Sequence, residues 1–331
     1  MKLILDAMSG DLGCAPVVEA AVRAVHELGL EVVLVGDEAA LTEKLAGRTA
    51  GITVKHASEV VDMHDAPTTV IRQKKDSSMV VALNLLAAGE GDALVSCGNT
   101  GALLTGATLL VKRIKGVRRA CLGAMIPTGK GHSLLLDCGA NAECTTEYLT
   151  QFAHMGYHYF RREKGVERPT VGLLNNGSED SKGTPLQQET YAVLRQQSEA
   201  GVINFIGNVE GRDIAEGAAD VLVADGFTGN LVLKTYEGVG MFLVSMMKSM
   251  FKRSLLTKLA ALMVKSDLMN MKKMMDYKEV GGAPLLGICK PVIKAHGGSD
   301  EAALFGAIRQ AVRYTEGNVV EAIAASLTAA E

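Results

Sequence analysis

The sequence predicts an α/β fold in which a mostly parallel sheet is covered by helices on both faces. Short apolar runs alternate along the chain with longer segments that carry apolar residues at helical spacing. The apolar runs are continuous, which is typical of parallel strands buried on both faces. Glycine is abundant at 36 residues, whereas Trp is absent and Phe and Tyr number 7 each. This composition favours tight turns and close backbone approaches over aromatic-rich β-sandwich packing.

Each expected strand is a short run rich in Val, Ile and Leu, and helical segments separate most of these runs. The strands are expected at Lys2–Leu5, Glu31–Val35, Ile52–His56, Ala93–Val95, Cys121–Ile126, Ser133–Leu136, Val171–Leu174, Val202–Ile206 and Val221–Ala224. The helices are expected at Pro16–Leu28, Glu38–Leu45, Ser78–Ala88, Ala102–Val111 and Glu301–Tyr314. A length of 331 residues fits two domains or one large one. We expect one α/β domain over 1–331, with 241–276 as a protruding helical segment.

The composition excludes several classes of protein. Hydrophobic residues make up 48% and charged residues 21% of the chain, so it is globular and not disordered. The net charge of −3 gives no global reason to bind nucleic acid, and we expect no such partner. Six scattered cysteines form no C-x-x-C pair, so no metal site is expected. The first apolar run stops at Asp6, too short for a signal peptide, and no stretch reaches the ~18 apolar residues of a membrane span. We therefore expect a cytoplasmic protein with reduced thiols.

Residues 241–276 break the alternation of strands and helices. The segment has a local charge of +5 and holds nine of the 15 methionines. Leu255, Leu262 and Met269 recur at intervals of seven, as do Lys258, Lys265 and Lys272, so apolar and basic residues fall on separate helix faces. One interpretation is a helical hairpin packed in a dimer interface. Another is an amphipathic surface that touches a membrane or an acyl chain, and the two are compatible.

Five strands end in turns rich in Gly, Asn, Asp or Ser that lead into helices. The segments are LILDAMSGD, ALVSCGNTGALL, LLLDCGANAE, GLLNNGSEDSKG and VLVADGFTGNLVLK. In open α/β sheets, ligands bind beyond the carboxyl ends of the strands, so the five loops predict a common cleft. Each loop alone is explained equally well as a tight turn with a helix N-cap. None matches a dinucleotide or P-loop pattern, so no nucleotide cofactor is expected.

One of these loops, SCGNTG at 96–101, fits the physics of phosphate binding. Unpaired backbone N–H groups and the positive dipole end of a helix attract an anion, and glycines allow a close approach. The candidate phosphate-binding residues are Ser96, Gly98, Asn99, Thr100 and Gly101. Simple N-capping by Asn99 or Thr100 is the alternative.

Other polar residues near the loops are candidates for the chemistry. Lys182 and Lys234 could donate to a phosphate or a developing oxyanion, although a lone lysine is usually a solvated surface charge. His296, just before a helix, could handle a proton or simply make a helix-entry hydrogen bond. In two loops an Asp ends a strand and an Asn follows it. Each Asp could shape the site, or it could be a structural cap. These pairs are Asp137 with Asn141 and Asp225 with Asn230.

As an ordered set, the loops resemble the phosphate acyltransferase PlsX family of bacterial phospholipid synthesis. The segments that carry the resemblance are DAMSGD, VSCGNTGALL, LLDCGAN, LLNNGSEDSKG, DGFTGN and YKEVGGAPLLGICKPVIKAHGGSD, spanning Leu5 to about Ala311. The sequence departs from the family pattern at Ser9, commonly Gly, at Cys97, commonly Ala, and at NNGSED, where NIGEE-like sequence is usual. Leu12–Cys14 also lengthens the first turn, and a second glycine follows Gly297.

The resemblance implies a homodimer with a Rossmann-like three-layer α/β/α core, similar to phosphotransacetylases and to isocitrate and isopropylmalate dehydrogenases. It also implies the reaction of acyl-[acyl carrier protein] with inorganic phosphate, giving an acyl phosphate and free carrier protein. A membrane-bound glycerol-3-phosphate acyltransferase would consume the acyl phosphate, and neither a metal nor a nucleotide is required.

Motif position and chemistry together assign expected roles. Phosphate binding falls to the 96–101 residues given above, and catalysis to Lys182, Lys234, Asn230 and His296. The residues expected to shape the cleft are Asp6, Asp11, Asp137, Asn141 and Asp225. An acyl-enzyme on Cys97, with a thiol pKa lowered at a helix N-terminus, is the alternative to direct attack by phosphate.

Acyl carrier proteins are strongly acidic, so a basic docking patch is expected. The candidate contacts with the carrier protein or a membrane surface are Lys112, Arg113, Lys115, Arg118, Arg119, Lys252, Arg253, Lys258 and Lys265. Three rival functions remain open: a coenzyme A-dependent phosphotransacetylase, a hydroxyacid dehydrogenase of the isopropylmalate type, and a lipid-sensing scaffold without enzymatic activity.

Overall fold

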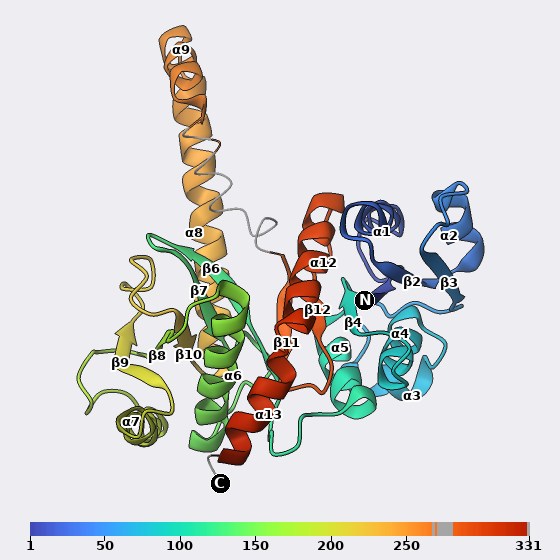
Figure 1. Ribbon diagram of the computed structural model, residues 1–331. Coiled ribbons are helices and arrows are strands. Elements are labelled where there is room, and N and C mark those ends of the chain that lie inside the picture. The colour runs from blue at the N-terminus through green and yellow to red at the C-terminus, as the bar shows by residue number, and fades with distance from the viewer. Residues whose placement is uncertain (267–268, 270–280, 330–331) are drawn as a thin grey trace.

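The computed structural model describes residues 1–266, 269 and 281–329, and it confirms the α/β prediction (Figure 1). The described strands form two sheets, one of seven strands and one of five. The hydrophobic pattern shows which segments become strands, but it does not show which strands pair. The division into two sheets is therefore a property of the tertiary structure.

The first sheet is parallel except at one edge. Its order is β3 (Ile52–His56), β2 (Glu31–Gly36), β1 (Lys2–Asp6), β4 (Ala93–Ser96), β12 (Val292–Lys294), β11 (Ala283–Leu286) and β5 (Cys121–Leu122). The strands from β3 to β12 run parallel, whereas β11 is antiparallel to both of its neighbours. The register sets Asp6 beside Ser96, and Ser96 beside Lys294, at the carboxyl ends of three adjacent strands.

The second sheet is parallel apart from one hairpin. Its order is β6 (Ala124–Thr128), β7 (Gly131–Leu136), β10 (Val221–Val223), β8 (Thr170–Asn175) and β9 (Asn204–Glu210). Strands β6 and β7 are antiparallel, and the other pairs are parallel. The carboxyl ends of β7, β10 and β8 lead into three of the polar loops that the sequence singles out.

Helices cover the sheets, and side-chain caps set several of their first residues. Their bounds are α1 (Ala15–Leu28), α2 (Glu38–Leu45), α3 (Pro67–Gln73), α4 (Ser78–Ala87), α5 (Thr100–Gly106), α6 (Thr146–Lys164), α7 (Pro185–Glu199), α8 (Gly226–Lys252), α9 (Leu255–Met263), α12 (Glu301–Glu316) and α13 (Val319–Ala329). The Asp37 carboxylate accepts from Ala40 N at 2.7 Å and so begins α2. Asp300 does the same for α12 through Ala303 N at 3.0 Å. A short side-chain acceptor thus satisfies a backbone donor that the first turn leaves unpaired.

Successive side chains of a strand point to opposite faces of the sheet, so the same strands contribute residues to two hydrophobic clusters. Leu3 and Ile293 face α1 and α12, whereas Ile4 and Val292 face α4 and α5. Both clusters continue into the second sheet, the first through Leu134, Leu136 and Val171, and the second through Leu135, Leu174 and Leu222.

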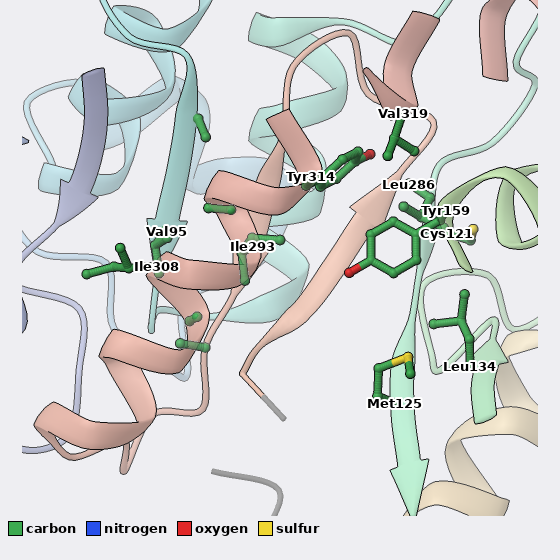
Figure 2. Packing of buried hydrophobic residues seen from close by; sticks show 14 of the residues in the cluster. Val95, Cys121, Met125, Leu134, Tyr159, Leu286, Ile293, Ile308, Tyr314 and Val319 are labelled. Carbon is green, nitrogen blue, oxygen red and sulfur yellow. The ribbon is translucent and has the colours of Figure 1, made fainter. Parts of the chain in front are cut away.

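Figure 2 shows the first cluster at the place where the two sheets meet. Ile293 and Ile308 lie on the side of the first sheet, and Leu134 lies on the side of the second. Between them, the rings of Tyr159 and Tyr314 pack edge to face with centroids 5.3 Å apart. The two sheets therefore share one buried interior.

The expected strand Cys121–Ile126 is divided at Gly123, which corrects the prediction of a single strand. Its first part is β5 of the first sheet and its second part is β6 of the second. Gly123 N donates to Pro284 O at 2.9 Å. A side-chain carbon on Gly123 would lie 3.0 Å from Leu136 Cδ2 and 3.3 Å from Pro284 Cγ. The chain thus crosses between the sheets at a residue that has little room for a side chain.

Several other boundaries differ from the prediction by one or two residues, and β9 and the helix expected at Ala102–Val111 show the largest changes. Strand β9 begins at Asn204 and not at Val202, because a left-handed turn at Gly201, with φ of 77°, separates it from α7. It then runs to Glu210, since its partner β8 continues to Asn175. The helix expected at Ala102–Val111 begins at Thr100, and its last turn, Ala107–Val111, is a π-helix.

Helix α8 projects far from the body of the molecule, and α9 folds back against its outer end (Figure 1). The two helices enclose a hollow of about 430 Å³ whose lining includes Met247 and Phe251 from α8 and Leu262 from α9. Residues 241–263 lie in α8, in α9 and in the turn between them, whereas 267–268 and 270–276, with Lys272, lie outside the described residues. Within the described part of the chain, no helix is long and apolar enough to cross a bilayer.

Candidate active site

The first part of the site is a buried hydroxyl–carboxylate cluster at the carboxyl ends of β1 and β4. Asp6 is 2% exposed and accepts hydrogen bonds from Ser96 Oγ and Ser78 Oγ, both at 2.6 Å. Ser96 Oγ in turn accepts from Gly98 N at 3.1 Å and shapes the turn that follows β4. Because both carboxylate oxygens of Asp6 hold hydroxyl donors, Asp6 fixes the base of the 96–101 loop.

Polar side-chain groups of the 96–101 loop make hydrogen bonds within the protein. Asn99 Oδ1 accepts from Ala102 N at 3.0 Å and caps α5. Asn99 Nδ2 donates to Met63 O at 3.0 Å and Asp65 O at 3.3 Å, so it also ties down a neighbouring loop. The donors left to meet a ligand are therefore backbone N–H groups and the half-buried Thr100 hydroxyl.

The loops after β1 and β12 close over this turn. Asp11 N donates to Gly297 O at 2.9 Å. A side-chain carbon on Gly297 would lie 2.5 Å from Asp11 Oδ2, so the carboxylate of Asp11 covers that glycine. His296 is exposed beside it, and its Nδ1 accepts from Gly298 N at 3.1 Å. This hydrogen bond orients the imidazole ring at the rim of the site.

The second part of the site is built around Asp137 at the carboxyl end of β7. Asp137 is fully buried, and its Oδ1 accepts from Leu122 N at 2.9 Å while its Oδ2 accepts from Asn141 N at 2.7 Å. Asn141 Nδ2 reaches back to Ala120 O at 2.9 Å. Burial raises the pKa of the Asp137 carboxyl, and these hydrogen bonds oppose the rise. Asp137 and Asn141 thereby hold in place the segment before Gly123, where the chain passes from the first sheet to the second.

The start of α8 packs directly on the Asp137 loop. Asp225 accepts from Thr228 N at 2.9 Å and caps the helix. Gly226 N donates to Asn141 O at 2.7 Å, and a side-chain carbon on Gly229 would lie 1.9 Å from Asp137 O. The exposed side chain of Asn230 lies against Gly139, where a side-chain carbon would be 3.5 Å from Asn230 Cβ. Glycines at these positions let two predicted loops form one surface.

The two predicted lysines differ in their surroundings. Lys234 Nζ pairs with Glu237 at 2.8 Å, and its charge reaches the first sheet, where it contributes to lowering the pKa of Lys294. Lys182 is exposed, and its contacts are with its own loop, where its side chain lies over Gly177 and its carbonyl accepts from Asn175 Nδ2 at 3.2 Å.

The structure argues against the alternative of a reactive thiol at Cys97. The side chain is 2% exposed, and burial raises the pKa of the Cys97 thiol to about 12. The nearby Lys294 lowers this pKa only in part, and the charges of Asp6 and Asp11 raise it further. The thiol stays protonated at neutral pH, so it is not an activated nucleophile.

Sequence reasoning missed Lys294, a cation that is 8% exposed at the end of β12. It lies beside Ser96 in the register and donates from Nζ to Cys97 O at 3.1 Å. The signal was present in the run PVIKAHGG, where a lysine closes an apolar strand just before a glycine-rich turn.

The predicted basic contacts fall on two separate surfaces. The first five follow the π-helical turn and are exposed: Lys112, Arg113, Lys115, Arg118 and Arg119. Arg113, Arg118 and Arg119 line a polar hollow of about 360 Å³ with Tyr148, and Arg118 Nε pairs with Glu147 at 2.8 Å. The others lie at the tip of α8 or along α9 and beyond it, and Lys252, Lys258 and Lys265 rim the apolar hollow there.

Solved structures with the same fold support the two-part architecture. The EutD phosphotransacetylase from Staphylococcus aureus superposes with a TM-score of 0.63 at 16% identity, covering 96% of this chain and 94% of that one. A phosphotransacetylase from Streptococcus pyogenes gives a TM-score of 0.64 at 18% identity, with coverage of 97% and 94%. At these identities the likeness concerns the fold alone.

Sequence relatives are much closer. A phosphate acyltransferase from Thermoanaerobacterium thermosaccharolyticum is 44% identical over 323 residues, which cover 98% of this chain and 96% of the relative. One from Bacillus subtilis is 44% identical over 325 residues, covering 98% and 97%. The model of the family described as "Fatty acid synthesis protein" matches residues 1–322. The chain therefore belongs to this fatty acid synthesis family, together with the phosphate acyltransferases that resemble it over nearly their whole length.

Proposed function

We propose that this chain moves a fatty acyl group from acyl-[acyl carrier protein] to inorganic phosphate, giving an acyl phosphate for phospholipid synthesis. The observation that carries the proposal is the 44% identity to a phosphate acyltransferase over 98% of the chain. The arrangement of the polar loops agrees with it, because cations and backbone donors gather where two groups of strand ends meet.

The chemistry asks little of the protein beyond placement and charge stabilisation. A phosphate oxygen attacks the thioester carbonyl carbon, a C–O bond forms, and the carbonyl electrons move onto oxygen. Collapse of this oxyanion breaks the C–S bond, and the carrier leaves as a thiolate that takes a proton from solvent. Phosphate is already nucleophilic at neutral pH, so the enzyme has to align it and stabilise the oxyanion.

The proposed roles follow the positions of the loops. The 96–101 loop holds the phosphate through backbone N–H groups and Thr100, on the base that Asp6 and Ser96 fix. Lys234, with Asn230 on the same face of α8, stabilises the oxyanion, and His296 donates at the rim. Lys182, in the loop between β8 and α7, is assigned to the opposite side of the site. The residues assigned to shaping the loops are Asp11, Asp137, Asn141 and Asp225.

The test is release of free thiol from purified long-chain acyl-carrier protein, with and without inorganic phosphate, in the absence of nucleotide and in the presence of a chelator. Release that saturates with phosphate, together with a hydroxylamine-reactive acyl product, is expected. Equal or better use of acyl-coenzyme A would favour the phosphotransacetylase alternative. Absence of any release from folded protein would contradict the proposal.

We further propose that the basic residues 112–119 dock the acidic carrier protein. The polar hollow lined by Arg113 and Arg119 supports this, because the five cations of the segment are exposed. Arg113→Glu and Arg119→Glu should raise KM for the acyl carrier while leaving KM for phosphate unchanged. Lys130→Glu, an exposed lysine between β6 and β7, is the control. Parallel loss of both affinities would contradict a separate docking surface.

The α8–α9 hairpin is the proposed site of contact with the inner face of the cell membrane and with a second copy of the chain. Leu256 and Met263 are 79% and 87% exposed, next to a lysine-rimmed apolar hollow. Such a surface suits a homodimer that rests on anionic lipid and passes acyl phosphate to a membrane-bound glycerol-3-phosphate acyltransferase. Salt-sensitive flotation with anionic but not neutral vesicles is expected, and sedimentation should give a dimer. Absence of flotation would restrict the hairpin to protein contacts.

We also propose that the chain is a single domain with 241–276 as a protruding segment. In support, both hydrophobic clusters run through both sheets. A single cooperative unfolding transition is the expected result, and two separate transitions would contradict it.

A further inference from the structure

Lys294 is a buried cation whose charge has no carboxylate partner. Among the described residues, no carboxylate oxygen lies within 4.0 Å of its Nζ. Within the described part of the chain, Nζ donates to two backbone carbonyls, those of Cys97 at 3.1 Å and of Ala295. An ammonium group has three N–H donors, so the third is left for a ligand. Burial of an ammonium that is not neutralised is costly, and an anion bound at this place would remove the cost.

The position of Lys294 follows from the strand register. Asp6, Ser96 and Lys294 occupy matching positions on three adjacent parallel strands, at their carboxyl ends. Asp6 accepts one hydrogen bond on each carboxylate oxygen, from the hydroxyls of Ser78 and Ser96. Lys294 is the member of this row with an N–H donor to spare. Burial lowers the pKa of Lys294, and the carboxylates of Asp11 and Asp6 oppose this shift.

Ser9 is a second, independent indication of a ligand. Its side chain is 6% exposed, and its Oγ makes no hydrogen bond within the described part of the chain. A side-chain carbon on Gly98 would lie 3.1 Å from Ser9 Oγ, so the hydroxyl borders the 96–101 loop. Buried hydroxyls without a partner are rare in native proteins, and a bound group commonly explains them.

Glycines let the loops after β1, β4 and β12 pack closely together. Gly10, Gly98 and Gly297 line the place where the loops after β1, β4 and β12 meet, and side-chain carbons there would lie 3.5 Å or less from Cys97, Ser9 or Asp11. The charge of Lys234, on α8, also contributes to lowering the pKa of Lys294.

We infer that Lys294 and Ser9 bind the attacking phosphate, with Lys294 Nζ and Ser9 Oγ donating to two of its oxygens. This inference rests on the proposed function and adds two residues to its phosphate site. Asp11 completes the site on chemical grounds. Hydrogenphosphate carries one proton, and the carboxylate of Asp11, beside Gly297, is the acceptor for that O–H. Sulfate has no proton to donate at neutral pH, so its charge meets the Asp11 carboxylate without a hydrogen bond. The site therefore selects phosphate over sulfate.

The experiment measures binding of inorganic phosphate to the full chain by calorimetry, with sulfate as the comparison ion. Lys294→Met keeps the length of the side chain and removes its charge, and we expect it to weaken phosphate affinity at least tenfold. Ser9→Gly should weaken it several-fold, and Asp11→Asn should reduce the preference for phosphate over sulfate. Lys55→Met, an exposed lysine on edge strand β3 of the same sheet, is the matched control and should bind phosphate normally.

Unchanged phosphate affinity in Lys294→Met overturns the inference. If Lys294→Met does not fold, Ser9→Gly decides, because removing a hydroxymethyl group creates no overlap, and unchanged affinity there overturns the shared site. Kinetics separate the two proposals. Normal phosphate-dependent thiol release and a normal phosphate KM in Lys294→Met refute the new site alone. Phosphate binding that requires Lys294, in a wild-type protein that releases no thiol, refutes the acyltransferase proposal alone.

Discussion

Replacing Gly229 by alanine tests whether the two polar loops of the second sheet are held together by the absence of one side chain. Gly229 lies in the first turn of α8, and an added Cβ would be 1.9 Å from Asp137 O and 3.0 Å from Asp137 C. Gly238 lies on the same helix, and an added Cβ would have nothing within 4 Å. The two substitutions make the same chemical change on one helix in opposite packing environments.

The magnitudes follow from these distances. Alanine is favoured over glycine in a helix interior by about 1 kcal/mol, so Gly238→Ala should be slightly stabilising. Gly229→Ala gains the same amount, but the overlap is with a backbone carbonyl in a buried loop and cannot be relieved by a rotamer change. Overpacking costs about 1–3 kcal/mol, occasionally more, and weakening the hydrogen bonds of Asp137 to Leu122 and Asn141 adds about 0.5–1.5 kcal/mol each. The expected net loss is about 2–4 kcal/mol.

Urea denaturation followed by far-UV circular dichroism gives the free energy of unfolding of both variants. Phosphate-dependent thiol release, measured where both proteins are folded, reports the geometry of the loops. We expect Gly238→Ala to match or exceed wild type in stability and activity, and Gly229→Ala to lose both. Equal stability and activity of the two variants would refute the reasoning, because the Asp137 loop would then be free to move away from α8.

Three further outcomes are expected. Cys97→Ala should keep its activity, because a thiol with a pKa of about 12 is protonated at neutral pH, and loss of thiol release in folded protein would restore the acyl-enzyme. Asp6→Asn should lower the free energy of unfolding by about 2–3 kcal/mol in urea, since one of the Ser78 and Ser96 hydroxyls loses its acceptor and the other keeps only a neutral one, and an unchanged midpoint would contradict this. Burial is the main cause that lowers the pKa of His158 to about 4, so the unfolded chain binds the extra proton below its ordinary pKa of 6.5. Stability should fall by about 2–3 kcal/mol between pH 6.5 and 4, and His158→Gln should show a smaller fall in acid titrations of unfolding; an identical fall would exclude His158 as its source.

Much of the local structure could be predicted because it depends on neighbouring residues. The strand at 52–56 and the helix at 38–45 were predicted at the bounds that the structure has, since apolar runs and a capping Asp37 define them within a few residues. The break at Gly123 could not be predicted in this way. Its cause is contact with Leu136 and Pro284, which are distant in sequence.

The candidate site shows the same division. The polar loops could be found from composition, because turns after parallel strands carry Gly, Asn and Asp. What each side chain does inside them depends on partners from elsewhere in the chain. Asn99 holds Met63 and Asp65, Asp6 holds Ser78, and the buried charge of Lys294 is visible only once β12 lies beside β4.

The sequence by itself determined the α/β class, the order of loops that identifies the family, and the basic, methionine-rich hairpin. These features are encoded in periodicity and motif order, which a linear chain carries in full. The tertiary structure alone decided that the strands form two sheets, that the Cys97 thiol is buried, and that Lys294 and Ser9 border the same 96–101 loop. The physical reason is that pairing, burial and charge neutralisation depend on distances between residues as much as 285 positions apart, as Ser9 and Lys294 are, and such distances exist only after folding.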